Sequence, residues 1–190
     1  MAKRLLFVKR RTALDVDTFR AGLRSSAAAT AHLHFTHDSG YRLHEPVYDA
    51  VVEASESGEA FDPALVDEAG SGSLIADEVV IVDGTPPPDA VTMFAFLNRL
   101  PGTERTTFQQ YWRDHHGPIA GRVPGLRRYV QNHTIGDRDD SYDGIAQTWF
   151  DDLDAMRTSA TSAELGKTRA DEPNFMISGR LPFVVCVPVR

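Results

Sequence analysis

The chain has 190 residues, which suits one medium domain or two smaller ones. It carries 20 basic and 27 acidic side chains and has no Lys/Arg-rich stripe, which argues against nucleic acid or an anionic membrane as its main partner. The single cysteine, Cys186, has no partner for an internal disulfide, and no apolar run approaches a signal-peptide core or a membrane span, so we expect a cytoplasmic protein.

The first half is predicted to run strand, helix, strand, strand, helix, strand. β-Branched and aromatic residues place the strands at residues 3–10, 32–36, 50–54 and 78–82, and the helices at residues 16–26 and 63–69. The proline-rich run 83–89 cannot continue a strand or start a helix cleanly. We therefore place one unit at residues 1–84, a linker at 85–90 and a second unit at 91–190.

The second half repeats the same order. Strands are expected at residues 92–99, 126–134, 144–150 and 181–188, and helices at 106–115 and 153–159, the latter with a continuation to 170. This order is that of a ferredoxin-like unit, so the fold class is α+β with tandem ferredoxin-like repeats, βαββαβ twice.

An internal repeat supports this division. Phe19 falls on Phe108 at an offset of 89 residues, whereas Tyr48 falls on Tyr142 at an offset of 94. The difference of five residues predicts an insertion between the helix and the third strand of the second half. The His-His-Gly-Pro motif at residues 115–118 lies there, and the first half lacks it.

Several motifs in the second half recur in order over the length of a domain. They are Tyr111-Trp112, Asp114-His-His-Gly-Pro118, Gly125-Leu126, Tyr129-Val-Gln-Asn-His133, Asp143-Gly-Ile-Ala146, Trp149-Phe-Asp-Asp152 and Asp171-Glu-Pro-Asn-Phe175. Through them, residues 93–187 resemble the EthD family of the dimeric α+β barrel superfamily. The first half matches only through the internal repeat.

The resemblance implies a barrel in which two units meet sheet to sheet, with a ligand in the lumen and the helices outside. A lone four-stranded sheet with helices on one face leaves its other face bare, so two units must pair. Since both units lie in one chain, we expect one pseudo-dimeric barrel per chain. A homodimer formed through the second halves is the alternative.

Strand alternation predicts which side chains line the lumen, because neighbours point to opposite faces. Two glutamines would lack hydrogen-bond partners beneath a helix, and this argument assigns them and their same-face neighbours to the lumen. The predicted ligand-binding set is Tyr129, Gln131, His133, Gln147 and Trp149. The alternative is that these are ordinary sheet residues whose polar side chains lie at solvent-exposed ends of the strands.

His115 and His116 are expected where the helix ends, because Gly117-Pro118 forces a turn. Unpaired carbonyls there would favour the imidazolium form and raise the histidine pKa. His116 is the candidate acid or base, His133 is a second candidate, and His115 is a candidate ligand contact. The alternative is a helix-capping histidine beside an exposed one.

The first half has its own histidines, His32, His34, His37 and His44. His32 and His34 share a strand face, but no carboxylate or cysteine at suitable spacing completes a metal site, so we expect no metal. Heme, which relatives elsewhere in the superfamily bind, is a minor alternative, because no heme motif is present. The strand register decides whether His34 and Thr36 or Leu33 and Phe35 face the lumen.

Two functions remain open. The first is a cofactor-free enzyme performing acid–base chemistry, of cyclase, dehydratase or decarboxylase type, on an aromatic or polyketide-like metabolite, as the resemblance implies. The second is a non-catalytic protein that binds a hydrophobic metabolite or assists a partner oxygenase. No phosphate loop, nucleophile elbow or catalytic carboxylate pair is recognisable.

Overall fold

A computed structural model describes residues 2–37, 46–55, 61–136, 142–179 and 181–188. The first half contains β1 (Lys3–Arg10), α1 (Val16–Ser26), β2 (His32–Phe35), β3 (Ala50–Ser55) and β4 (Val66–Val82). The second contains β5 (Val91–Leu97), α2 (Arg105–Tyr111), a π-helical turn (Trp112–His116), α3 (Gly117–Ala120), β6 (Leu126–Thr134), β7 (Gly144–Phe150), α4 (Leu153–Ser159), α5 (Ala163–Asp171) and β8 (Phe183–Cys186). Short 3-10 turns lie at Pro63–Leu65 and Glu172–Asn174.

The eight strands form one sheet in the order β2-β3-β1-β4-β6-β7-β5-β8, with antiparallel neighbours. Its two outer strands meet, because a bridge joins Thr36 to Cys186. The backbone N–H of His37 also donates to the Val185 carbonyl at 2.8 Å, and that of Val187 donates to the Phe35 carbonyl at 3.2 Å. The sheet therefore closes into a barrel within one chain, and the predicted α+β barrel-type pseudo-dimer is confirmed.

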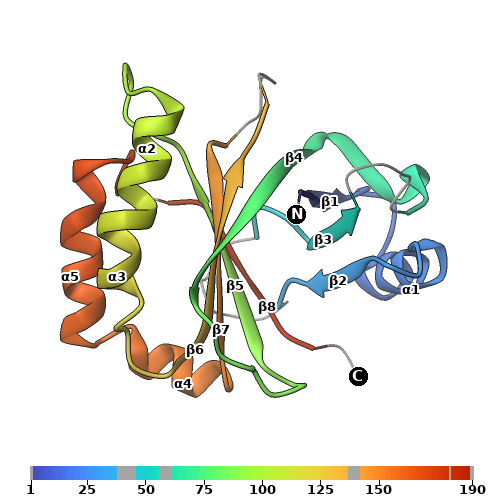
Figure 1. Cartoon of the computed structure of the whole chain (residues 1–190). Coiled ribbons are helices and arrows are strands. Elements are labelled where there is room, and N and C mark those ends of the chain that lie inside the picture. Colours follow the sequence, from blue (N-terminus) through green and yellow to red (C-terminus); the bar gives the residue numbers. More distant parts are fainter. Residues whose placement is uncertain (1, 38–45, 56–60, 137–141, 180, 189–190) are drawn as a thin grey trace.

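The helices lie outside the barrel in two unequal groups (Figure 1). Helices α2, α3, α4 and α5 cover the second half of the sheet, whereas α1 lies beside the first-half strands. In the described part of the chain, no helix has both the length and the apolar character needed to cross a bilayer.

Side chains from both repeats pack together inside the barrel. Phe7 and Phe96 make an edge-to-face contact with ring centroids 5.3 Å apart, and the Tyr48 and Tyr142 hydroxyls are hydrogen-bonded at 2.9 Å. Each pair joins positions that the internal repeat had matched, at offsets of 89 and 94 residues. The pseudo-twofold axis of the duplication thus passes through the lumen.

The prediction of a second helix in the first half, at residues 63–69, is wrong. Only the 3-10 turn Pro63–Leu65 forms, and β4 begins at Val66 instead of at residue 78. β4 then pairs with β1 over its first part and with β6 over its second, so it joins the two halves. Proline beside acidic residues resembles a helix start, but the hydrogen bonds of a 17-residue strand outweigh that local preference.

Candidate functional site

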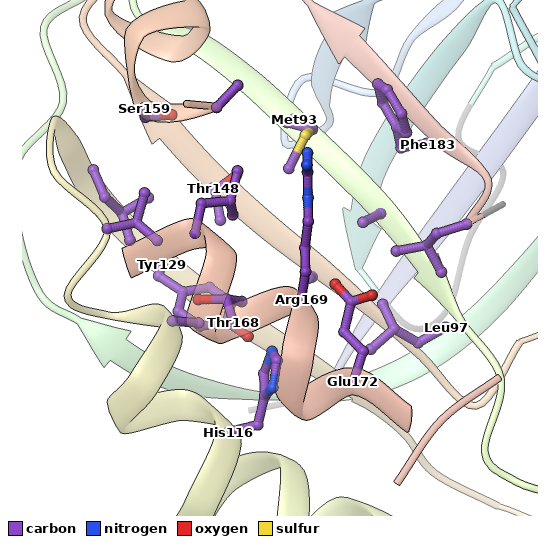
Figure 2. Close-up of a pocket in the computed structure, with 18 of the residues that line it drawn as sticks. Met93, Leu97, His116, Tyr129, Thr148, Ser159, Thr168, Arg169, Glu172 and Phe183 are labelled. Carbon is purple, nitrogen blue, oxygen red and sulfur yellow. The ribbon is translucent and has the colours of Figure 1, made fainter. Parts of the chain in front are cut away.

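A cavity of about 620 Å³ lies between the second half of the sheet and the helices that cover it (Figure 2). Most of its lining is apolar and comes from β5, β6, β7, α4, α5 and the segment before β8. The apolar lining includes Met93, Ala95, Leu97, Trp112, Val123, Leu126, Phe150, Met156, Leu165, Met176, Leu181 and Phe183. The polar side chains of the lining are those of His116, Tyr129, Thr148, Ser159, Thr168, Arg169, Glu172 and Ser178. This composition is that of a small-molecule site.

The first half is packed differently on its helix side. Phe19 and Leu23 of α1 are buried against Val8, Phe35 and Ala50 of the sheet. The second half has α4 and α5 as additional covering elements, and both contribute cavity-lining residues. Helices α4 and α5 have no counterpart among the described residues of the first half, and they enclose the cavity together with the π turn and α3.

The lumen assignment of Tyr129, Gln131 and His133 is wrong. These side chains point toward the helices, because Gln131 Nε2 donates to the Trp112 carbonyl at 2.8 Å and the His133 ring stacks on the Trp112 ring at 4.8 Å. Asn132, between them, faces the lumen and donates toward Gln147 at 3.5 Å. The candidate cavity therefore lies outside the barrel, beneath the helices.

Gln131 is satisfied beneath a helix because that helix is irregular. In the π turn, the Trp112 carbonyl accepts from the Gly117 backbone N–H and, with its second lone pair, from Gln131. The turn precedes Pro118, whose ring would clash with a carbonyl one turn earlier in a regular helix. A glutamine buried beneath a helix thus finds its hydrogen-bond acceptor within that helix, at the Trp112 carbonyl.

Gln147 and His34 do face the lumen. Gln147 Nε2 donates to Glu53 Oε1 at 2.7 Å, and His34 Nε2 contacts the same oxygen at 2.7 Å. Burial disfavours the charged form of Glu53, but hydrogen bonds and charge from His34 and Lys3 hold its pKa well below the usual range. The first-half register is thereby settled, since Leu33 and Phe35 pack on the α1 side.

Trp149 lies on the same side of β7 as Gln147, half-buried, with the Arg128 guanidinium 5.9 Å from its ring centroid. His34, Gln147 and Trp149 do not line the cavity described above. They belong to the barrel interior and its rim.

His116 lies in the π turn and not at a helix end, because the chain continues directly into α3. The expected rise of its pKa from unpaired helix carbonyls is therefore wrong. Burial of the ring lowers the pKa of His116, and the charge and hydrogen bond of Asp171 only partly offset this effect. His115 is exposed, contacts the Tyr111 ring in a tilted arrangement with centroids 4.9 Å apart, and does not line the cavity.

Asp171 orients the His116 ring. Its Oδ2 lies 2.9 Å from His116 Nδ1, and its Oδ1 accepts hydrogen bonds from the Tyr111 hydroxyl at 2.9 Å and Asn174 Nδ2 at 3.0 Å. Burial disfavours the Asp171 carboxylate, but these hydrogen bonds lower its pKa overall. A carboxylate at Nδ1 places the proton on that nitrogen, leaving the Nε2 lone pair of neutral His116 available. Figure 2 shows the ring directed into the cavity.

His133 occupies a structural position. Its Nε2 lies 2.9 Å from Gln131 Oε1, and because an amide oxygen only accepts, Nε2 carries the proton. Burial, followed by the charge of Arg113, lowers the pKa of His133 to about 4, so the ring is neutral near pH 7. It does not line the cavity.

Sequence reasoning missed several polar residues that line the cavity, and it missed the carboxylate that holds His116. Thr148 projects from β7, and its Oγ1 is buried without a hydrogen-bond partner in the described residues. Arg169 and Glu172 lie at the end of α5 and just after it, and burial raises the pKa of Glu172. Asp171 belongs to a motif that the sequence had marked, but nothing local indicated its contact with a histidine 55 residues away.

Among the described residues, no group of three or more His, Cys, Asp or Glu side chains is arranged to hold a metal ion. His44 lies outside the described residues.

Residues 100–178 match the family profile of the EthD domain. Among curated proteins, none matches the chain in sequence. The solved structure of an anthrone oxidase-like protein has 15% sequence identity to this chain and a TM-score of 0.62. The alignment covers 100% of this chain and 91% of that protein. A candidate monooxygenase from Fusobacterium nucleatum has 7% sequence identity and a TM-score of 0.62. The alignment covers 100% of this chain and 92% of that protein. A candidate chlorite dismutase has 14% sequence identity and a TM-score of 0.54. The alignment covers 100% of this chain and 94% of that protein. At these identities the likeness shows the fold of the whole chain and leaves the chemistry open.

Proposed function

Because residues 100–178 match the EthD family profile, we propose that the cavity binds a small aromatic or polyketide-like molecule and that the protein removes a proton from it. One observation carries the proposal, namely a neutral His116 that is oriented by Asp171 in an otherwise apolar cavity. A general base works best when its pKa lies near or below the working pH and its lone pair faces the substrate.

His116 is the proposed base. Its Nε2 takes a proton from an acidic C–H group of the ligand, and the Asp171 carboxylate stabilises the imidazolium that forms. The apolar lining excludes water, which strengthens these interactions. Tyr129 is retained as a ligand contact, whereas His115, His133, Gln131, Gln147, Trp149 and His34 are not part of this proposal.

Glu172 is the proposed acid. Its pKa is raised by burial while that of His116 is lowered, so the two groups suit opposite roles in proton transfer. A base and an acid in one cavity serve cyclase, dehydratase and decarboxylase reactions alike. The proposal therefore covers proton transfer in general, and the assay below tests that step without assuming one class of reaction.

A non-catalytic binding protein is the second candidate. The observation in its favour is the size and apolar character of the cavity, which retains a hydrophobic metabolite without any titrating group. Under this alternative, His116 and Asp171 only hold α5 against the π turn.

One experiment distinguishes the proton-transfer enzyme from the binding protein. Anthrone, a planar ketone with an acidic methylene group, is incubated with the protein in D₂O without oxygen, and NMR follows exchange of the methylene hydrogens. We expect His116→Ala to slow the catalysed exchange about 100-fold or more, with affinity kept within about tenfold. His115→Ala, at the adjacent exposed position, is the matched control and should behave like the wild type.

Each other result decides between the candidates. Saturable binding of anthrone without catalysed exchange favours the binding protein. Exchange that persists in His116→Ala excludes His116 as the base. Neither binding nor exchange would contradict the proposed ligand class.

A further inference from the structure

The hydroxyl group of Tyr129 has no acceptor in the described protein. Its oxygen accepts two hydrogen bonds, from Trp112 Nε1 at 3.1 Å and from Gln131 Nε2 at 3.2 Å. Both partners are obligate donors. Indole Nε1 cannot accept, and the amide orientation of Gln131 is determined by its bond to the Trp112 carbonyl. The hydroxyl hydrogen of Tyr129 must therefore point elsewhere.

The remaining direction is the cavity. Tyr129 lines it and is only 2% exposed, so bulk water does not supply the missing acceptor. A buried O–H group without an acceptor costs free energy, and a bound ligand oxygen would remove that cost.

A chain of hydrogen bonds strengthens this donor. His133 Nε2 donates to Gln131 Oε1, and Gln131 Nε2 donates in turn to the Tyr129 oxygen. Donors aligned in one direction polarise each other, so the Tyr129 O–H becomes a better donor than an isolated phenol. His133 and Gln131 therefore act on the ligand through Tyr129, without lining the cavity themselves.

Thr148 supplies a second hydroxyl beside the first. It is the cross-strand neighbour of Tyr129 in the β6–β7 pair, it lines the cavity, and its buried Oγ1 has no partner among the described residues. Residues paired directly across antiparallel strands have their Cβ atoms about 5 Å apart. The two hydroxyl-bearing side chains therefore come from neighbouring positions of the sheet that lines the cavity.

We infer that Tyr129 and Thr148 form an oxyanion site, and that the ligand is a planar ketone or its enol whose oxygen binds these two hydroxyls. The inference rests on the proposed function and specifies its substrate class. When His116 takes the C–H proton, the electron pair of that bond forms a carbon–carbon double bond and the carbonyl π electrons move to oxygen. The enolate oxygen then carries the negative charge that the two donors stabilise.

The site is built close to the base. Trp112, whose Nε1 holds the Tyr129 oxygen, begins the π turn that carries His116. Figure 2 shows Tyr129, Thr148 and His116 along one side of the cavity, with Arg169 standing across its middle. A single ring system could thus meet the base and the donors together.

The test compares anthrone with 9,10-dihydroanthracene, which has the same skeleton but no oxygen. The wild type is expected to bind anthrone more tightly, and Tyr129→Phe should reduce that preference about tenfold while leaving the affinity for 9,10-dihydroanthracene unchanged. Thr148→Val should act in the same direction. Tyr142→Phe, which removes a tyrosine hydroxyl from the lumen, is the matched control.

The exchange assay supplies a second readout. Because negative charge develops only after proton loss, Tyr129→Phe should lower the maximal exchange rate about 100-fold, more than it lowers affinity. Equal anthrone preference in the wild type and Tyr129→Phe, with His116-dependent exchange intact, would overturn the oxyanion site and leave the proposed function standing. Loss of His116 dependence alone would overturn the proposed function instead.

Discussion

The pH dependence of stability tests the structural role of His133. This ring is 5% exposed, and burial followed by the Arg113 charge lowers its pKa from 6.5 to about 4, while Asp77 acts weakly in the opposite direction. Because the folded pKa lies below the unfolded one, the unfolded chain binds a proton more readily. The stabilising contribution is complete above pH 6.5 and is lost as the pH falls toward 4.

The magnitude follows from the two pKa values. At pH 5.5 the unfolded histidine is mostly protonated and the folded one is almost entirely neutral. The unfolded state then gains about 1.4 kcal/mol from His133 relative to pH 7.5. Complete protonation of both states, near pH 3, would bring the loss to about 3 kcal/mol.

Urea unfolding at several pH values between 7.5 and 5.5 measures this term. The wild type and His133→Gln are compared, since the variant keeps a side-chain N–H donor for Gln131 but does not titrate. The fall in unfolding free energy should be about 1.4 kcal/mol smaller in His133→Gln. His115→Gln, at an exposed site, is the control and should follow the wild type.

Equal pH slopes in the wild type and His133→Gln would refute this reasoning. Such a result would mean that the imidazole keeps an ordinary pKa, so that burial and the Arg113 charge do not hold it neutral.

Three further changes test other parts of the structure. Asp171→Asn should lower the pKa of His116 further, because it removes the charge that favours imidazolium; long-range ¹H–¹⁵N NMR measures this pKa, and an unchanged value would argue against the pair. Gly144→Ala should cost about 1–3 kcal/mol in thermal unfolding, because the new Cβ would lie 2.5 Å from Trp112 Cζ3. Gly166→Ala, with open space around it, is its control and should be neutral or stabilising. Glu53→Gln should cost about 3 kcal/mol, since it removes the carboxylate that His34 contacts and leaves Lys3 with Glu78 alone. A loss below about 1 kcal/mol would mean that water screens this cluster.

Much of the fold was predictable from local signals. The strand and helix positions of the second half agree closely with the structure, because apolar periodicity and the enrichment of β-branched and aromatic residues in strands are short-range properties. The duplication was also visible, and its matched tyrosines meet in the lumen. The first-half helix at 63–69 failed because long-range pairing of β4 with β1 overrode a local preference.

The face of β6 was not predictable in the same way. Residues 129–134 are all buried, because the barrel interior covers one side of the strand and the helices cover the other. A strand buried on both faces has no polar and apolar alternation to reveal its orientation. Gln131 and Asn132 were therefore equally plausible lumen residues, and only the Trp112 carbonyl separates them.

The amino-acid sequence by itself determined the repeated α+β plan and the concentration of histidines in the second repeat, since both are written in the order and spacing of neighbouring residues. Only the tertiary structure decided that the cavity lies beneath the helices, that Asp171 pairs with His116, and that Tyr129 lines the cavity. These features depend on side chains brought together from distant segments by sheet closure and helix packing. Local spacing carries no information about such contacts.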